Sequence, residues 1–257
     1  MCLILVAWRA HPDFPLVVAA NRDEWFARPA TPAAWWADPP GILAGQDLEA
    51  GGTWLGINRQ GAFAGLTNFR DPTRQPLGGP SRGALVRDAL AHPLPVAERL
   101  AWLARHGGDY NGFNLIFSDG QDLAIFESVS GQGRVLGPGV YGLSNHLLDT
   151  PWPKVQRAKS RLHAALDSLP DADPLLALLR DDQPAPDQAL PRTGVSLEWE
   201  RLLSSAFIRA PGYGTRCSTV ILGDPGGRCH FQEWTWDEAG HPASIARHSF
   251  LSATAGA

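Results

Sequence analysis

Short apolar runs recur in pairs along this chain, and a turn motif separates the two runs of each pair. The first pair, residues 2–8 and 15–22, flanks Pro12, and the second lies within residues 51–69 around "NRQG". Two further pairs, within residues 113–129 and 215–236, turn at Asp119-Gly120 and at residues 223–227. Apolar strands joined by tight turns form hairpins, so the sequence predicts sheets that are largely antiparallel.

Helical patterns separate these hairpins. Residues 81–92 begin with Ser81 as a candidate N-cap, residues 95–107 end at Gly107, and residues 150–169 carry apolar side chains at helical spacing. Shorter helices are expected over residues 173–181 and 196–208. Segregated helices cover the outer faces of sheets, which predicts a layered α+β fold.

Two Pro-rich segments, residues 27–41 and 181–194, are expected to be loops. The first carries Trp35 and Trp36, which either cover an apolar ligand or simply pack.

Length and composition exclude several classes of protein. The strands come from both ends of the 257 residues, so we expect one domain over residues 1–257, with a mobile tail at residues 248–257. A net charge of −4 offers nucleic acid no electrostatic attraction. Three irregularly spaced cysteines predict neither a disulfide framework nor a metal site, and no apolar run is long enough for a signal peptide or an integral membrane segment. These features predict a cytoplasmic protein; they say nothing of its oligomeric state.

The stretch "ANRDEW", residues 20–25, places three charges and an amide at the end of an apolar strand. When the first hairpin is counted outward from Pro12, Cys2 faces Arg22 or Asp23. The thiol nearest the N-terminus therefore lies beside this charged motif, which indicates a site.

Cys2 directly follows Met1, and its small side chain permits an aminopeptidase to remove Met1. The freed α-amine has an ordinary pKa of about 7.7–8.0 and can act as a base near neutral pH. A thiol beside its own amine forms an N-terminal nucleophile, whose amine Asp23 can orient and whose thiolate Arg22 can favour. The alternative is a buried structural cysteine at the start of a strand.

Several stretches resemble the NRDE family, also called the transport and Golgi organization 2 family. They include "MCLI", "AANRDEWFARP", "GGTWLGIN", "GLTNFRDP", "YGLSNHLLDTPWPKV" and "YGTRCSTVIL", in that order from Met1 to about Leu222. That family in turn resembles the cysteine N-terminal-nucleophile hydrolases, such as bile-salt hydrolase and penicillin V acylase. The resemblance implies a four-layer αββα sandwich of antiparallel sheets and cleavage of unactivated amides.

The resemblance also implies roles for single residues. Cys2 matches the nucleophile of those hydrolases, Asp23 the residue that binds its amine, and Arg216 the late arginine near the nucleophile. Asn68 and Asn145 match the two strand asparagines. Asn145 is expected to stabilise the oxyanion, with Asn68 as a candidate second donor, because amide N–H groups suit that task. The alternative is that each asparagine caps a turn.

One position departs from the hydrolase pattern. Their early arginine falls where this chain has Ala20 and Asn21, and Arg22 alternates to the strand face opposite Asp23. Arg22, Asn68 and His146 are expected to bind substrate.

Two functions are compatible with these features. The first is a cysteine amidohydrolase that acts on a small or amphipathic amide through Cys2, after removal of Met1 and without a cofactor. The second is a non-catalytic binding or trafficking protein for a lipid, an acyl-CoA or haem on the same scaffold, with Cys2 or His146 as the axial ligand of a transported haem. Both predict a small-molecule or amphipathic ligand as the partner.

Overall fold

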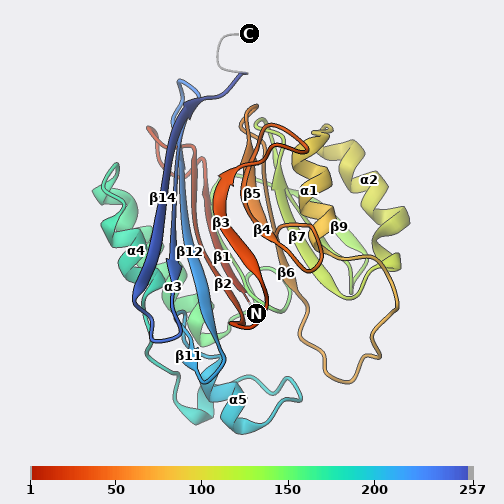
Figure 1. Cartoon of the computed structure of the whole chain (residues 1–257), viewed down its shortest axis with the longest axis vertical. Coiled ribbons are helices and arrows are strands. Elements are labelled where there is room, and N and C mark those ends of the chain that lie inside the picture. Colours follow the sequence, from red (N-terminus) through yellow and green to blue (C-terminus); the bar gives the residue numbers. More distant parts are fainter. Residues whose placement is uncertain (1, 254–257) are drawn as a thin grey trace.

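The computed structural model describes residues 2–253, which form four layers in the order helix, sheet, sheet, helix (Figure 1). The first sheet runs in the order β10 (Gly139–Leu143), β1 (Cys2–Trp8), β2 (Leu16–Trp25), β12 (Tyr213–Gly223), β13 (Arg228–Trp236) and β14 (Pro242–Leu251), with β11 (Arg209–Ala210) paired to β12. The second sheet runs in the order β3 (Ala30–Trp35), β4 (Ile42–Asp47), β5 (Leu55–Asn58), β6 (Phe63–Asn68), β7 (Phe113–Ser118), β8 (Leu123–Glu127) and β9 (Gln132–Leu136). All of these strand pairs are antiparallel.

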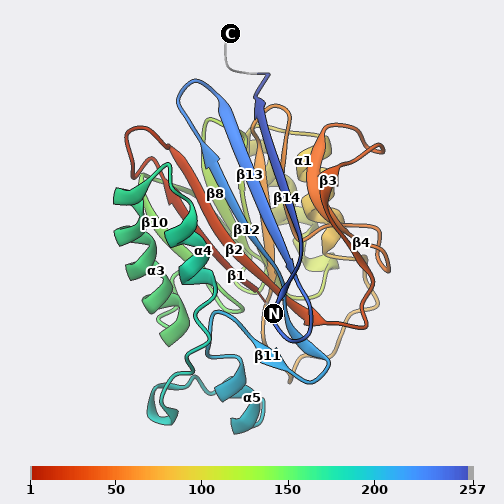
Figure 2. The same cartoon turned by 60° about the vertical axis from the view of Figure 1, so that its left-hand side comes forward.

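Helices cover the outer face of each sheet. Figure 2 shows α3 (Pro153–Ala165) and α4 (Asp173–Leu179) against the first sheet. On the second sheet lie α1 (Gly83–Ala91) and α2 (Val96–His106), while α5 (Leu197–Leu202) lies below the sheets in Figure 1, at the end where the chain begins. Short 3₁₀ helices follow as η1 (Gly107–Asp109), η2 (Leu166–Ser168) and η3 (Asp187–Ala189).

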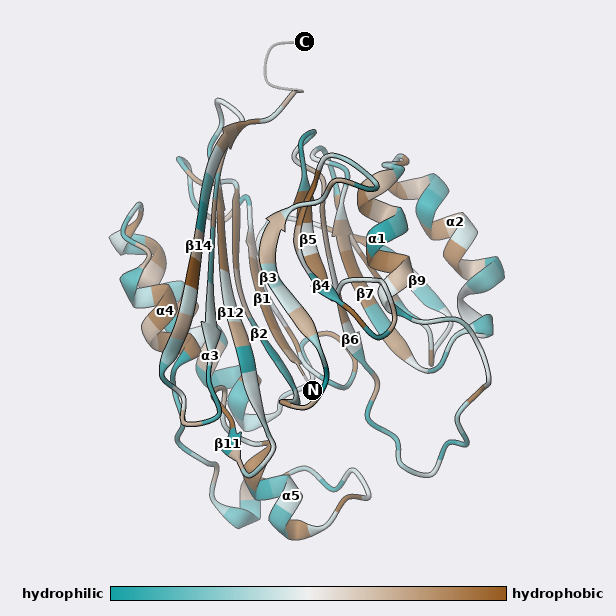
Figure 3. Cartoon of the chain, in the orientation of Figure 1, coloured by the Kyte–Doolittle hydropathy of each residue, from teal (hydrophilic) through white to brown (hydrophobic). Residues whose placement is uncertain are grey.

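Alternation along the strands builds three apolar layers. On β1, Leu3 and Leu5 pack under α3 and α4, whereas Ile4 and Val6 pack between the sheets. A third cluster fills the space beneath α1 and α2. Figure 3 shows the resulting hydrophobic residues along the strands of both sheets. Because both sheets are covered on both faces, the residues of their central strands are largely buried.

The predicted architecture is confirmed. The four expected hairpins are β1–β2, β5–β6, β7–β8 and β12–β13, and five α-helices lie within the segments expected for them. Ser81 does not cap α1, whose N-cap is Arg82 with no side-chain hydrogen bond. In the described part of the chain, no helix is both long and apolar enough to cross a membrane.

The structure corrects the prediction of a loop over residues 27–41. This segment contains β3, which pairs with β4 around a register shift between Thr31 and Ala34. The Glu233 carboxylate accepts a hydrogen bond of 2.7 Å from the Ala33 backbone N–H. A side chain of the other sheet thus supplies the hydrogen-bond partner that the register shift denies to Ala33. Trp35 and Trp36 both pack against the core clusters.

The predicted mobile tail, residues 248–257, begins inside a strand. Residues 248–251 end β14 and pair with β13, and the Ser252 and Ala253 backbone N–H groups donate to Gly227 and Arg59. Residues 254–257 lie outside the described residues.

Candidate functional site

Cys2 is the first residue of β1, and its side chain faces the space between the two sheets. Its Cα lies opposite that of Arg22 on β2, so the pairing predicted from the first hairpin is confirmed. On its other side β2 pairs with β12, where Cys217 lies opposite Arg22. Both thiols therefore flank Arg22 at the same end of the first sheet.

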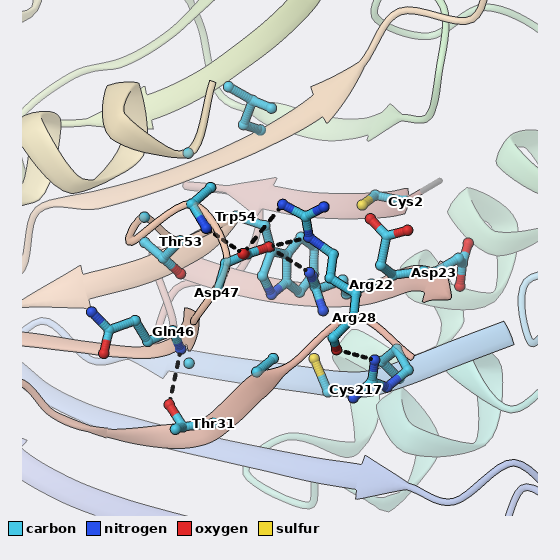
Figure 4. A pocket seen from close by; sticks show the side chains of 18 of the residues that line it. Cys2, Arg22, Asp23, Arg28, Thr31, Gln46, Asp47, Thr53, Trp54 and Cys217 are labelled. Atoms are coloured by element: carbon cyan, nitrogen blue, oxygen red, sulfur yellow. Dashed lines mark hydrogen bonds and ion pairs between the residues drawn. The ribbon is translucent and has the colours of Figure 1, made fainter. Parts of the chain in front are cut away.

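A cleft with a cavity volume of about 190 Å³ lies against Cys2. Figure 4 shows Cys2 and Asp23 toward one end of the cleft and Gln46 and Thr31 toward the other. The charged residues that line it are Arg22, Asp23, Glu24, Arg28, Asp47, Arg82, Arg216 and Glu233. Both signs of charge thus surround the opening beside the Cys2 thiol.

Asp47 organises two of the cleft arginines. Its Oδ2 accepts hydrogen bonds from Arg22 at 3.1 Å and from Arg28 at 2.6 Å, while its Oδ1 accepts from Arg28 at 3.2 Å (Figure 4). Burial acts against the charged form of Asp47, but the hydrogen bond and charge of Arg28 outweigh it and lower the pKa of Asp47. Asp47 is therefore ionised at neutral pH and holds Arg22 in the cleft.

Arg22 and Asp23 face opposite layers, as strand alternation predicts. Arg22 follows Val18 and Ala20 on the face between the sheets, the same face as Cys2. Asp23 is directed toward the helices, although it also reaches the cleft lining, and its Oδ1 accepts a hydrogen bond of 2.7 Å from the Thr215 hydroxyl. Burial raises the pKa of Asp23, and the positive charge of Lys154 opposes this shift.

A β-bulge on β12 places Arg216 in the site. Thr215 pairs with Asp23 and Cys217 pairs with Arg22, so Arg216 is an extra residue with no partner of its own on β2. Its Nη1 donates to the backbone carbonyls of Trp25 at 2.8 Å and Arg28 at 2.9 Å. Arg216 therefore anchors the segment that carries Arg28 and also lines the cleft.

Asn145 follows β10 and is fully buried between the ends of the two sheets. Its Oδ1 accepts a hydrogen bond from the Cys2 backbone nitrogen at 3.2 Å, and its Nδ2 donates to the Asn68 carbonyl at 2.8 Å. The Asn145 amide thus links the start of β1 to the end of β6.

Asn68 ends β6 and lines the cleft. Among the residues that the structure describes, its side-chain amide has no hydrogen-bond partner, whereas its backbone carbonyl accepts from Asn145. The Asn68 side-chain amide is therefore available to a group bound in the cleft that Cys2 also lines.

His146 is not among the described residues that line the cleft. Its ring lies between Phe69 and Trp152, with centroid distances of 4.9 and 5.8 Å, and its Nδ1 lies 2.8 Å from the Thr150 hydroxyl. Burial lowers the pKa of His146. The residue thus packs beneath the site as a neutral ring.

The Cys2 thiol is protonated at rest. Burial raises the pKa of Cys2 above its ordinary value, and the charge of Asp23 adds to this shift. The positive charge of Arg22 and a hydrogen bond from the Asp23 backbone act in the opposite direction. Because the thiol keeps its proton, any attack by sulfur requires a base.

Sequence reasoning missed Asp47, Arg82, Arg70 and Lys154. Asp47 is the last residue of β4 and Arg82 directly precedes α1, so their place in the site depends on the second sheet and its covering helix. Lys154 carried a usable signal, since it continues the apolar spacing of Ala158 and Leu162 on the buried face of α3. Within residues 2–253, no cluster of three or more His, Cys, Asp or Glu side chains is placed to hold a metal ion.

Comparison with known proteins identifies relatives over most of the chain. The family model described as Transport and Golgi organisation 2 matches residues 1–238. The cattle (Bos taurus) Transport and Golgi organization protein 2 homolog is 37% identical, over 91% of this chain and 92% of its own length. The human homolog is 36% identical over the same shares.

A solved structure supports the fold. The Caenorhabditis elegans ortholog of N-acylethanolamine-hydrolyzing acid amidase matches with a TM-score of 0.51 over 86% of this chain and 92% of that chain. At 10% sequence identity the likeness concerns the N-terminal-nucleophile-hydrolase fold alone. The family match, by contrast, spans nearly the whole sequence, and the chain belongs to the Transport and Golgi organisation 2 family.

Proposed function

We propose that this protein is an amidohydrolase whose nucleophile is the Cys2 thiol, exposed after removal of Met1. The observation that carries the proposal is the hydrogen bond from the Cys2 nitrogen to Asn145 Oδ1, at 3.2 Å, on a residue that lines the cleft. Once Met1 is removed, this nitrogen becomes an α-amine held beside its own thiol. Nucleophile and base then reside on one residue, as an N-terminal nucleophile requires.

The proposed reaction uses two steps. The Cys2 amine takes the thiol proton as sulfur attacks the amide carbonyl, and the Asn68 amide donates to the oxyanion that forms. When the tetrahedral intermediate collapses, the C–N bond breaks, the leaving amine receives the proton, and a thioester remains on Cys2. Water then hydrolyses the thioester, which releases the acid and restores the thiol.

The size of the cavity supports a small acyl group, or one end of an amphipathic substrate. Its volume of about 190 Å³ lies below the ~300–1,000 Å³ of pockets that enclose a whole drug-sized ligand. The rest of an amphipathic substrate would then extend out of the cleft.

Intact mass and an acylating probe test the proposal. We expect the purified protein to lack Met1 and an alkyne-tagged β-lactone to acylate Cys2 in the wild type. Cys2→Ala abolishes the labelling, whereas Cys217→Ala, which removes a second thiol from the same cleft, retains it. A mature protein that keeps Met1, or labelling that survives Cys2→Ala, would contradict the proposal.

The second candidate function is binding of a lipid, an acyl-CoA or haem without turnover. Two observations favour it: burial raises the pKa of the Cys2 thiol, and the relatives are named for transport and Golgi organization. Since His146 is packed beneath the site, Cys2 is the better candidate for an axial ligand of a transported haem. Saturable binding of haem or of lipid vesicles, together with no acylation, would favour this function instead. Lipid binding should be equal in wild type and Cys2→Ala, whereas haem held by the Cys2 thiol should bind more weakly to Cys2→Ala.

A further inference from the structure

Lys154 is a buried cation that the reaction described above does not use. The chain holds two lysines, Lys154 and Lys159, both on α3, and its other basic side chains apart from histidine are arginines. Lys154 is 3% exposed, whereas Lys159 reaches the surface and pairs with Asp149. Within residues 2–253, the Lys154 ammonium group has no hydrogen-bond partner. A buried charge of this kind is costly unless neighbouring charges compensate it.

Several charged or titratable groups face Lys154 from the surrounding elements. Asp23 on β2 acts on it most strongly, followed by Arg70, which comes after β6, and Cys2 on β1. Two further residues belong to this buried group: Tyr213 on β12, which interacts with Asp23, and Glu200 on α5, which pairs with Arg70.

Among the positive charges near Asp23, Arg70 is paired with a second carboxylate, whereas Lys154, within the described part of the chain, is not. Arg70 forms an ion pair of 3.1 Å with Glu200, and both side chains are 5% exposed. The second Glu200 oxygen accepts from the Thr193 backbone and hydroxyl, each at 2.7 Å. Arg70 thus has a carboxylate partner of its own, and Lys154 is the positive charge that lowers the pKa of Asp23 most strongly.

We infer that Lys154 is a positioning residue of the Cys2 site, whose ammonium group keeps Asp23 ionised and favours the thiolate of Cys2. The inference rests on the proposed function, since it assigns Lys154 to the same nucleophile. Lys154 is not among the described residues that line the cleft, so it acts through Asp23 and Cys2 and does not touch the substrate.

The choice of lysine at this position has a physical consequence. Burial lowers the pKa of Lys154 to about 8, while the charges of Asp23 and Cys2 oppose that shift. Lys154 is therefore positively charged below about pH 8 and loses its charge above it. An arginine would stay charged throughout this range.

Alkylation of Cys2 tests the inference without a substrate. The rate of Cys2 carbamidomethylation by iodoacetamide is followed by peptide mass between about pH 6 and about pH 10, a range that spans the ordinary pKa values of cysteine and of an α-amine. Near pH 7, Lys154→Met is expected to slow the reaction roughly tenfold, which corresponds to one pKa unit in the thiolate fraction. The difference narrows above about pH 8, where wild-type Lys154 is itself neutral.

Two further variants separate charge from packing. Lys154→Arg keeps the positive charge and is expected to retain most of the wild-type alkylation rate near pH 7. Lys159→Met removes the other lysine of the same helix and is expected to leave the profile unchanged. An unaltered pH profile in Lys154→Met would overturn the inference, because a merely structural role would change stability and not this profile.

A measurement on the wild type covers the case in which Lys154→Met does not fold. Protein labelled with ¹³C-lysine gives two side-chain signals, which Lys159→Met assigns. The Lys154 signal is expected to titrate near pH 8, and Asp23→Asn is expected to lower its midpoint by removing the carboxylate charge. A Lys154 midpoint at the ordinary value of about 10.4 would overturn the inference.

The β-lactone probe distinguishes this failure from failure of the proposed function. If the probe acylates Cys2 but Lys154→Met leaves the alkylation profile unchanged, only the role of Lys154 is wrong. If no protein is acylated, the amidohydrolase proposal fails, and the role of Lys154 in the reaction fails with it.

Discussion

Asn145 Oδ1 accepts a hydrogen bond from the backbone nitrogen of Cys2 at 3.2 Å, which connects the end of β10 to the start of β1. The same amide donates to the Asn68 carbonyl at 2.8 Å and so reaches the second sheet. One buried side chain therefore sets the position of the candidate nucleophile relative to both walls of the cleft.

Replacing Asn145 is expected to destabilise the fold as well as the site. Asn145→Ala leaves the Cys2 N–H and the Asn68 carbonyl without this partner, and each buried unsatisfied group costs about 1–3 kcal/mol. Urea unfolding should show a loss of this order. Asn145→Asp keeps the oxygen that accepts from Cys2 and should lose less, and an Asn145→Ala protein as stable as the wild type would show that the amide is dispensable.

Asn68→Ala should slow the acylation of Cys2 while leaving the stability of the fold nearly unchanged. The Asn68 side-chain amide has no hydrogen-bond partner among the described residues, so its removal should change the free energy of unfolding by less than about 0.5 kcal/mol. Loss of one oxyanion donor should slow acylation of Cys2 roughly 100- to 1,000-fold. Acylation at the wild-type rate would assign the oxyanion to another donor.

The Asp47 carboxylate should contribute a pH-dependent part of the stability. Its pKa is lower in the folded state than its ordinary value, so the contribution is fully present above the unfolded-state pKa of about 3.9 and is lost as pH falls through the folded-state pKa. The difference in unfolding free energy between wild type and Asp47→Asn should therefore be larger at neutral pH than below pH ~3.9. Glu49→Gln, which removes an exposed partner of Arg28, provides the control and should change stability by less than about 0.5 kcal/mol.

The buried pair of Arg70 and Glu200 should respond strongly to the loss of one partner. Arg70→Met leaves the Glu200 carboxylate buried without its cation, which is expected to cost about 3–5 kcal/mol in guanidinium unfolding. The double variant Arg70→Met with Glu200→Gln should recover part of that loss, because the remaining group is then neutral. Equal stabilities of the single and double variants would mean that the hydrogen bonds from Thr193 suffice to compensate the Glu200 side chain.

Much of the fold could be predicted because its determinants are local. Apolar runs separated by tight turns specified the hairpins β1–β2, β5–β6, β7–β8 and β12–β13. Counting outward from the first turn predicted that Cys2 faces Arg22 or Asp23, and the structure pairs it with Arg22. The strands β3, β9 and β14 escaped notice because their residues are largely exposed, and they lack a continuous apolar pattern. Pairing with a neighbouring strand, which sequence alone does not reveal, makes them strands.

The site was predicted less completely, because its partners come from separate elements. The roles expected for Cys2 and Asp23 remain predictions, as does the oxyanion role first expected of Asn145, whose amide is held by Cys2 and Asn68. The bulge at Arg216 depends on the register between β2 and β12, and no local sequence pattern indicates it.

Because Arg216 is an extra residue, the length of β12 can change by one residue at this bulge without changing its pairing with β2. Pairing is regular from Tyr213 to Thr215 and again from Cys217 to Gly223, with one residue between the two stretches. If Arg216 were deleted, the two stretches of β12 could join directly, and all the remaining residue pairs between β2 and β12 could stay in register. A single inserted codon would thus be enough to add an arginine to the rim of the cleft, and a single deletion enough to remove it, while the sheet beneath stays the same.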